Sequence, residues 1–256
     1  TGSPEVGALV QKAAADRTIK CVLELGGKSP QIVFEDADLG RAVTFIVKAI
    51  TQNSGQTCSA GSRLLVQKSI YERFVATVAD HFSASSAGTP TMDRDCGPLI
   101  NVAQKKRVEG FIVRAQESGI PLLAQGQVAG GCPAGGYYVP PTLFGPVPRD
   151  HELACNEVFG PVLSAIPFED EADAIALANS TEFGLLAGVW TRDGARQVRV
   201  AKAMKCGQVY LNCYGAGGGV ELPFGGVKRS GYGREKGFLA LQEFCTAKTI
   251  VQYFGE

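Results

Sequence analysis

Histidine is scarce in this chain of 256 residues, and that scarcity limits the catalytic sites that the sequence can build. The only two histidines are His81 and His151. A nucleophile of the Cys/His or Ser/His kind needs an imidazole beside it as general base. His81 falls on the surface of a predicted amphipathic helix, and His151 falls in the polar segment PRDHELA. We therefore expect any general base to be a different kind of residue.

Charge imbalance, long apolar runs and paired cysteines are also missing. With 25 basic and 25 acidic residues, and no basic cluster interleaved with aromatic residues, we expect no nucleic-acid partner. No apolar run approaches the roughly 18 residues of a membrane span, and no signal pattern opens the chain, so we expect no membrane contact and a cytoplasmic location. The eight cysteines never form C-x-x-C, so we expect free thiols and no metal site.

Apolar strands alternate with amphipathic helices along the chain. We therefore predict an α/β fold, with an open and mostly parallel sheet flanked by helices. The Gly- and Pro-rich stretch 125–150 is predicted to be a loop or hairpin, and 215–237 a glycine-rich segment. Predicted strands cover 21–25, 29–34, 63–67, 162–168, 185–191, 208–212 and a final run at 248–254, and predicted helices cover 4–16, 36–52, 71–82, 104–119, 171–180 and 195–204.

Cys58 stands among small and polar residues, in the segment TQNSGQTCSAGSR at 51–63. Such neighbours leave room for a reactant to approach the sulfur, whereas a structural cysteine usually packs among apolar side chains. If residues 55–61 turn into a helix, its backbone N–H groups would lower the thiol pKa and hold an oxyanion. On these residues alone, a nucleophile and a core cysteine both remain open.

Glu24 interrupts the apolar run VLEL, and Gly26 and Gly27 follow it. Partial burial would raise the pKa of this carboxyl toward neutrality, where a carboxylate is an effective general base. A strand-end glutamate in a salt bridge is the alternative. The following GGKS does not complete a phosphate-binding loop, because that motif needs glycine where Val22 stands.

Five segments in one order carry a resemblance to a known family. They are LELGGKSP at 23–30, GQTCSAGSR at 55–63, GYYVPPTLF at 136–144, NEVFGPV at 156–162 and PFGGVKRSGYGRE at 223–235. Together they resemble the NAD(P)-dependent aldehyde dehydrogenase superfamily over nearly the whole chain. The resemblance implies a remnant of a dinucleotide-binding domain at 1–25, a catalytic domain at 26–240 and an oligomerisation segment with a C-terminal strand at 241–256.

The same resemblance implies a mechanism for oxidising an aldehyde to a carboxylic acid. Cys58 matches the nucleophile that forms a thiohemiacetal, from which hydride passes to NAD or NADP. Glu24 matches the base that activates water to hydrolyse the resulting thioester. Glu157 matches the residue that holds the nicotinamide ribose, and Phe159 matches the one that contacts the nicotinamide.

Other cofactor residues are implied by position in the family motifs. Gly2 and Ser3 match a turn beside the pyrophosphate, Leu25 and Gly26 lie near the nicotinamide, and Gln104 reaches toward the adenosine ribose. Asn156 replaces a glutamate that the family commonly has before the ribose-binding residue. Substrate identity and the choice between NAD and NADP are not encoded in these motifs.

The chain begins at Thr1, and most of the family's cofactor domain lies upstream of the Gly-Ser turn. We therefore expect the chain alone not to oxidise aldehydes. Two alternatives remain open, namely a residual cysteine-dependent esterase or thioesterase and a noncatalytic module that forms homo-oligomers through 248–254.

Overall fold

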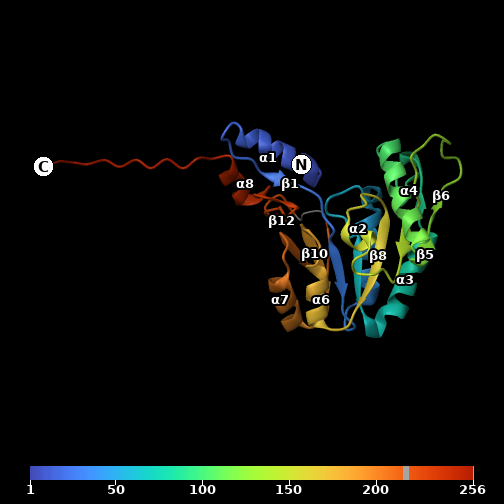
Figure 1. The fold of residues 1–256 in the computed structure, drawn as a ribbon. Helices are drawn as coiled ribbons and strands as arrows, with labels where there is room; N and C mark the ends of the chain where they lie inside the picture. Colours follow the sequence, from blue (N-terminus) through green and yellow to red (C-terminus); the bar gives the residue numbers. More distant parts are fainter. Residues whose placement is uncertain (216–218, 256) are drawn as a thin grey trace.

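A seven-stranded sheet forms the centre of the computed structural model, which describes residues 1–215 and 219–255 (Figure 1). Every neighbouring pair of its strands is parallel except the edge pair β5 and β7. The predicted α/β fold with a mostly parallel sheet is therefore confirmed. In spatial order the strands are β11 (Gln208–Leu211), β10 (Leu186–Trp190), β2 (Pro30–Val33), β3 (Arg63–Gln67), β8 (Val162–Phe168), β7 (Thr142–Phe144) and β5 (Leu122–Gln125).

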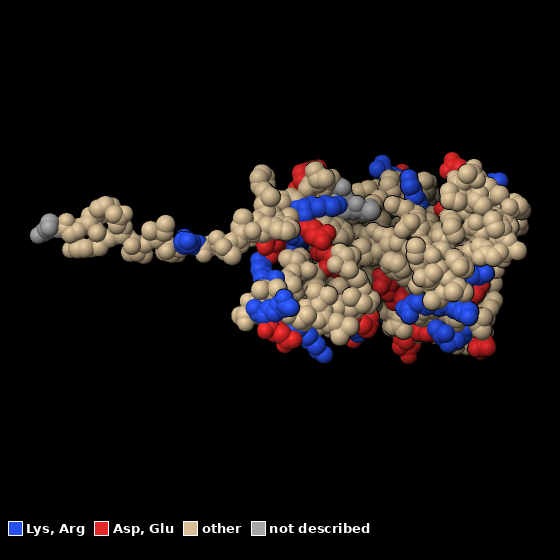
Figure 2. Space-filling model, turned by 90° about the horizontal axis from the view of Figure 1, so that it is seen from above, with Lys and Arg blue, Asp and Glu red and all other residues tan. Residues whose placement is uncertain are grey.

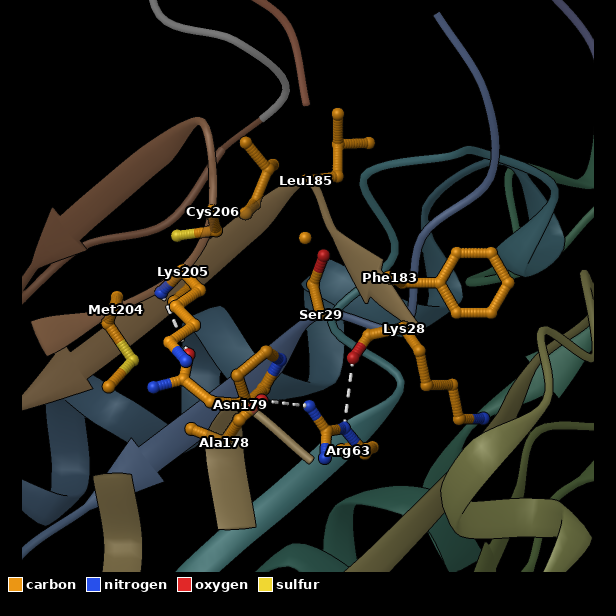
Figure 3. Close-up of a pocket in the computed structure, with 14 residues that line it drawn as sticks. Lys28, Ser29, Arg63, Ala178, Asn179, Phe183, Leu185, Met204, Lys205 and Cys206 are labelled. Carbon is orange, nitrogen blue, oxygen red and sulfur yellow. Dashed lines mark hydrogen bonds between the residues drawn. The ribbon is translucent and has the colours of Figure 1, made fainter. Parts of the chain in front are cut away.

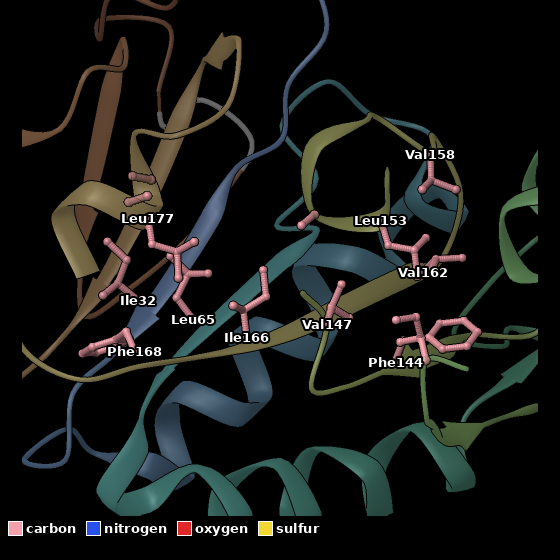
Figure 4. Close-up of a cluster of buried hydrophobic side chains, with 14 of the residues drawn as sticks. Ile32, Leu65, Phe144, Val147, Leu153, Val158, Val162, Ile166, Phe168 and Leu177 are labelled. Carbon is pink, nitrogen blue, oxygen red and sulfur yellow. The ribbon is translucent and has the colours of Figure 1, made fainter. Parts of the chain in front are cut away.

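Helices cover both faces of this sheet, because successive strand side chains point to opposite faces. Ile32 belongs to the apolar cluster under one layer of helices, and its neighbour Val33 belongs to the cluster under the other (Figure 4 shows the former). The first layer consists of α4 (Val102–Glu117), α5 (Glu152–Cys155), α6 (Glu171–Ala178) and α7 (Gly194–Ala203), and the second of α2 (Leu39–Thr51) and α3 (Tyr71–Ala84).

A smaller group of elements lies at one end of the sheet, where segments from both ends of the chain meet (Figure 1). Strand β1 (Leu23–Glu24) pairs antiparallel with β13 (Gly231–Tyr232), and Glu24 lies opposite Gly231. This pairing places the glutamate against a segment more than two hundred residues away. The group also contains α1 (Pro4–Ala15), β9 (Phe183–Gly184), β12 (Val227–Lys228) and α8 (Gly237–Glu243).

The remaining elements are short and lie in the loops. They are β4 (Ser86–Ala87), β6 (Gln127–Val128) and the 3-10 turns η1 (Gln52–Gly55), η2 (Lys68–Ile70) and η3 (Pro90–Met92). The predicted strand at 21–25 forms only over Leu23–Glu24, since its partner β13 is itself two residues long. Residues 216–218 of the glycine-rich segment, and residue 256, lie outside the described part.

The strand predicted at 248–254 is wrong for the single chain. Residues 245–255 contain neither helix nor strand, and Figure 1 shows them extending away from the body. A strand needs a neighbour to accept and donate its backbone hydrogen bonds, and no described segment pairs with this one. The side chains of Ile250, Val251, Tyr253 and Phe254 are therefore 80–90% exposed.

Acidic and basic side chains mix on the face of the molecule that Figure 2 shows, in keeping with the balanced charge of the sequence. Across residues 1–215 and 219–255, no helix combines the length and the apolar character needed to cross a membrane.

Burial in the central sheet predicts which substitutions lower the free energy of unfolding most. Leu65 lies in β3 with 0% of its surface exposed, whereas Leu9 on α1 is 65% exposed. Leu65→Ala should lower the free energy of unfolding by about 3 kcal/mol, because it leaves a cavity at the sheet centre. Urea denaturation measures this, and the matched Leu9→Ala should change it by less than about 1 kcal/mol. Equal losses in the two variants would contradict this account of the core.

Candidate functional site

Three of the sequence motifs meet at the end of the sheet where its parallel strands begin, because each motif precedes one of three neighbouring strands. This end of the sheet is called the sheet edge. Gly26 and Gly27 come before β2, Cys58 comes before β3, and Glu157 comes before β8. Parallel strands begin at the same edge, so residues that precede them gather there. This explains why segments up to 130 residues apart form one site.

The chain makes an unusual turn just before Cys58. Asn53 and Ser54, inside η1, have left-handed backbone angles with φ of 51° and 55°, and Gly55 follows with φ of 70°. A side chain at Gly55 would overlap the backbone of Gly160. Left-handed residues other than glycine are uncommon and gather at functional sites. This strained turn therefore connects the end of α2 to the segment that carries Cys58 and leads into β3.

Cys58 does not stand at the start of a helix, as one sequence-based hypothesis required, but in a turn between η1 and β3. Its thiol pKa is raised, first by burial and then by the negative charges of Glu157 and Glu24. The backbone N–H groups of Ser59 and Cys58 act in the opposite direction and lower this pKa. The predicted lowering by a helix N-terminus is thus wrong, although local N–H groups do favour the thiolate.

Gly26 and Gly27 permit two close approaches that a larger residue would prevent. The Gly27 N–H donates to Oε1 of Glu157 at 2.9 Å. A methyl group at Gly26 would overlap the Glu157 carboxylate, and one at Gly27 would overlap the carbonyl oxygen of Cys58. The turn at residues 57–59 is called the cysteine turn. The glycine pair therefore lets this turn and Glu157 lie against the same backbone.

Glu24 is buried with only 3% of its surface exposed. Neither of its carboxylate oxygens has a hydrogen-bond partner in the described part of the chain. Burial raises the pKa of Glu24 to about 7, with a further rise from Glu235 and an opposing effect of Arg234. The predicted rise toward neutrality is confirmed, and the described residues offer no salt bridge to support the alternative.

Lys28 is a second buried ionisable group, which the sequence reasoning missed. It is 1% exposed, and its Nζ has no hydrogen-bond partner within the described residues. Burial, reinforced by Arg63, lowers the pKa of Lys28 to about 7, while Glu157 acts against this shift. The signal was present in the sequence, since Lys28 lies two residues before the buried strand PQIV.

Arg63 forms hydrogen bonds with the backbone of the segments next to Gly27 and at the end of α6 (Figure 3). Its buried guanidinium donates to the carbonyl oxygens of Lys28, Leu177 and Ala178 at 2.9, 2.9 and 2.7 Å. The cavity beside Arg63 in Figure 3 has a volume of about 10 Å³, which is room for about one water. It is too small for an organic substrate.

Two of the predicted cofactor residues line one cavity of about 290 Å³, namely Ser3 and Glu157. Ser3 caps α1, and its Oγ accepts from the N–H of Val6 at 3.3 Å. The N–H of Gly2 donates to the Glu24 carbonyl at 3.1 Å, which ties this helix start to β1. A helix N-terminus is suited to bind phosphate. Arg107 and Arg229 also line the cavity, as do Glu5 and Glu182, with which Arg229 forms ion pairs.

The other predicted cofactor residues occupy defined structural positions. Leu25 is 6% exposed and packs against Gly7 of α1. Phe159 has a left-handed backbone with φ of 59°. The Gln104 amide donates to the carbonyl oxygens of Val158 and Phe159 at 3.3 and 2.7 Å, so it supports the segment that carries Glu157. Contact of Gln104 with an adenosine ribose stays a prediction.

Tyr214 is a contact of the cysteine turn that sequence reasoning could not find. Its hydroxyl donates to the carbonyl oxygen of Ser59 at 2.8 Å, across 155 residues of sequence. No local pattern marks this tyrosine, because the contact depends on how β11 and β3 are placed in the sheet.

The raised pKa of Glu24 predicts a pH dependence of stability. The unfolded chain releases this proton near pH 4.5 and the folded chain near pH 7, so the free energy of unfolding should fall as pH rises through that window. Glu24→Gln should remove this part of the fall. Urea denaturation across the window tests it, with the exposed Glu117→Gln as matched control. An unchanged pH profile in Glu24→Gln would contradict the assignment.

The glycine pair yields a second prediction. Gly27→Ala should lower the free energy of unfolding by about 1–3 kcal/mol, because the added methyl group pushes the Cys58 carbonyl away. It should also change the alkylation rate of Cys58, followed by peptide mass mapping. Gly130→Ala is the control, since a methyl group there meets nothing within 4 Å. Equal behaviour of the two variants would show that the close approach is unimportant.

Comparison with known proteins places this geometry in a family. The sequence profile of the aldehyde dehydrogenase family matches residues 1–250. A betaine aldehyde dehydrogenase from Rhizobium leguminosarum bv. trifolii is 40% identical over 251 residues, which are 98% of this chain and 51% of that protein. The chain thus spans about half the length of the curated relatives that it matches.

Solved structures agree with the sequence match. A crystal structure of a Burkholderia cenocepacia protein assigned as an aldehyde dehydrogenase has a TM-score of 0.96 and 56% identity, covering 97% of this chain and 52% of that one. An NAD+ complex of aldehyde dehydrogenase from Bacillus cereus has a TM-score of 0.90 and 37% identity, covering 95% and 49%. From sequence profile and structure alike, the chain belongs to the aldehyde dehydrogenase family.

Proposed function

We propose that this chain carries the nucleophile and the general base of an NAD(P)+-dependent oxidation of an aldehyde to a carboxylic acid. One observation carries the proposal: Cys58 and Glu157 meet Gly26 and Gly27 at the sheet edge, beside a buried Glu24 whose pKa is about 7. A nucleophile that forms a covalent intermediate, together with a base that titrates near neutrality, suits this reaction.

In the first step the sulfur of Cys58 bonds to the aldehyde carbon, the C=O π bond opens, and a base relays the thiol proton to the former carbonyl oxygen. The raised thiol pKa makes a nearby base necessary, and Glu24 is charged above about pH 7. The product is a thiohemiacetal on Cys58. Loss of a hydride from this carbon and of the hydroxyl proton would leave a thioester on the same sulfur, and bound NAD(P)+ would supply the hydride acceptor.

In the second step water hydrolyses the thioester. Glu24 accepts a proton from that water, the new C–O bond forms, and the C–S bond breaks to return the thiolate. A carboxylate with a pKa near the working pH is effective in this role, because it is both largely deprotonated and basic enough.

The chain's own residues also fit a dinucleotide. Ser3 and the N-terminus of α1 would hold the pyrophosphate, and Glu157, kept in place by the Gly27 N–H, would hold the nicotinamide ribose. Positioning the ring against Cys58 is then the task of Phe159 and the backbone of Leu25 and Gly26. The shared cavity lined by Ser3 and Glu157 supports this arrangement.

The proposed function also divides the chain into three regions. Residues 1–25 would belong to a dinucleotide-binding domain, and 26–240 to the catalytic domain. Residues 241–256 would pair with a second copy of the chain, since the apolar side chains of the extended tail are 80% or more exposed at Ile250, Val251, Tyr253 and Phe254. Burial of such side chains against another sheet edge would give a homo-oligomer.

Ester hydrolysis tests the proposed roles without a cofactor. Reaction of p-nitrophenyl acetate with Cys58 should release nitrophenolate in a burst and leave an acetyl thioester. Cys58→Ala should lose the burst. Glu24→Gln should still release about one nitrophenolate per chain in the burst, but more slowly, because the thiol also loses its base. The later steady phase should slow by roughly 100- to 10,000-fold, because water lacks its base.

Stopped-flow absorbance separates these two phases, and Cys245→Ala, in the exposed tail, is the control that should match the parent chain. The steady rate of the parent chain should rise with pH through about 7, as Glu24 deprotonates. A burst that survives Cys58→Ala would overturn the proposal.

A further inference from the structure

A cavity of about 390 Å³ lies beside the cysteine turn, because Thr57 and Ser59, on either side of Cys58, both line it. It is large enough for a small organic molecule, in contrast to the cavity beside Arg63. The other residues that line it are Phe45, Lys48, Ala49, Gln52, Tyr214 and Gly215.

The aromatic walls of this cavity are fixed in place. The Phe45 ring packs on Trp190 with ring centroids 5.7 Å apart, and the Tyr214 ring lies 5.4 Å from that of Tyr210. The Tyr214 hydroxyl is already committed to the Ser59 carbonyl. These two side chains therefore offer ring surface, which suits the apolar body of a ligand.

The hydroxyls next to the thiol are also engaged. Thr57 and Ser59 bond to one another at 3.0 Å, so one donates to the other. This bond uses one of the two hydroxyl protons and leaves the other for a ligand oxygen, such as that of an aldehyde. Gln52 and Lys48 are further polar side chains that line the cavity.

Lys48 is the one charged side chain among the described residues that line the cavity. It extends from the last turn of α2 and is exposed, and it has no ion-pair partner within 4 Å in the described part of the chain. Asp95 shares a separate cavity with Lys48 and keeps its negative charge there, but no ion pair within 4 Å joins the two side chains. A lysine also suits a helix C-terminus, yet that role does not require it to line a cavity.

We propose that this cavity takes the body of an aldehyde whose far end carries a carboxylate, and that Lys48 selects that charge. The inference rests on the proposed function, because it places the aldehyde carbon at Cys58. Betaine aldehyde, which the name of several relatives gives as their substrate, carries a quaternary ammonium. Lys48 repels such a cation, so this chain discriminates against it.

Protection of the thiol tests the charge preference directly. Cys58 of the full chain is alkylated with neutral iodoacetamide, and its modification is followed by peptide mass mapping. Three aldehydes with the same aromatic body compete, namely 4-formylbenzoate, benzaldehyde and 4-(trimethylammonio)benzaldehyde. The concentration for half protection should be lowest for the anion and highest for the cation.

Variants of Lys48 assign the preference to its charge. Lys48→Gln should raise the half-protection concentration of 4-formylbenzoate by about threefold to tenfold at low ionic strength, and Lys48→Glu should reverse the order of anion and cation. Benzaldehyde should protect all variants equally. Lys68→Gln, an exposed lysine at the far end of β3, is the matched control and should behave as the parent chain.

The outcomes separate the two proposals. If no aldehyde protects Cys58, while Cys245 in the tail is alkylated normally, the proposed function fails and this inference fails with it. If benzaldehyde protects but the charge series is the same with and without Lys48, the proposed function stands and the assignment of Lys48 is overturned.

Discussion

The approach of two backbone segments at Gly26 and Gly27 is the constraint on which the site depends. Without a Cβ at these positions, the Cys58 carbonyl and the Glu157 carboxylate can both lie against the chain that leads into β2. Three parallel strands bring their preceding loops to one edge, but only the missing side chains let those loops touch. The sheet sets where the site is, and the glycine pair sets how closely it is packed.

Much of this arrangement could be predicted from sequence. The alternation of apolar and amphipathic segments indicated the α/β fold, and the glutamate inside VLEL indicated a buried carboxyl, which its pKa of about 7 confirms. Local sequence patterns predicted the structure less well where it depends on segments that are distant in the sequence. The turn before Cys58 uses left-handed residues instead of a helix start, and the tail at 248–254 has no partner strand in the single chain.

Long-range contacts explain what sequence could not supply. Tyr214 reaches the cysteine turn across 155 residues, and Lys48 faces the cavity only because α2 ends beside that turn. Arg63 is polar and begins an apolar strand, yet three backbone carbonyls satisfy its buried guanidinium. Each of these roles follows from packing between elements, which neither periodicity nor motif spacing encodes.

Burial moves the pKa of Glu24 up and that of Lys28 down, and both reach about 7. As pH rises through about 7, Glu24 therefore gains its negative charge while Lys28 loses its positive one. The summed charge of these two buried side chains changes from +1 to −1 across that range, although neither exposes more than 3% of its surface.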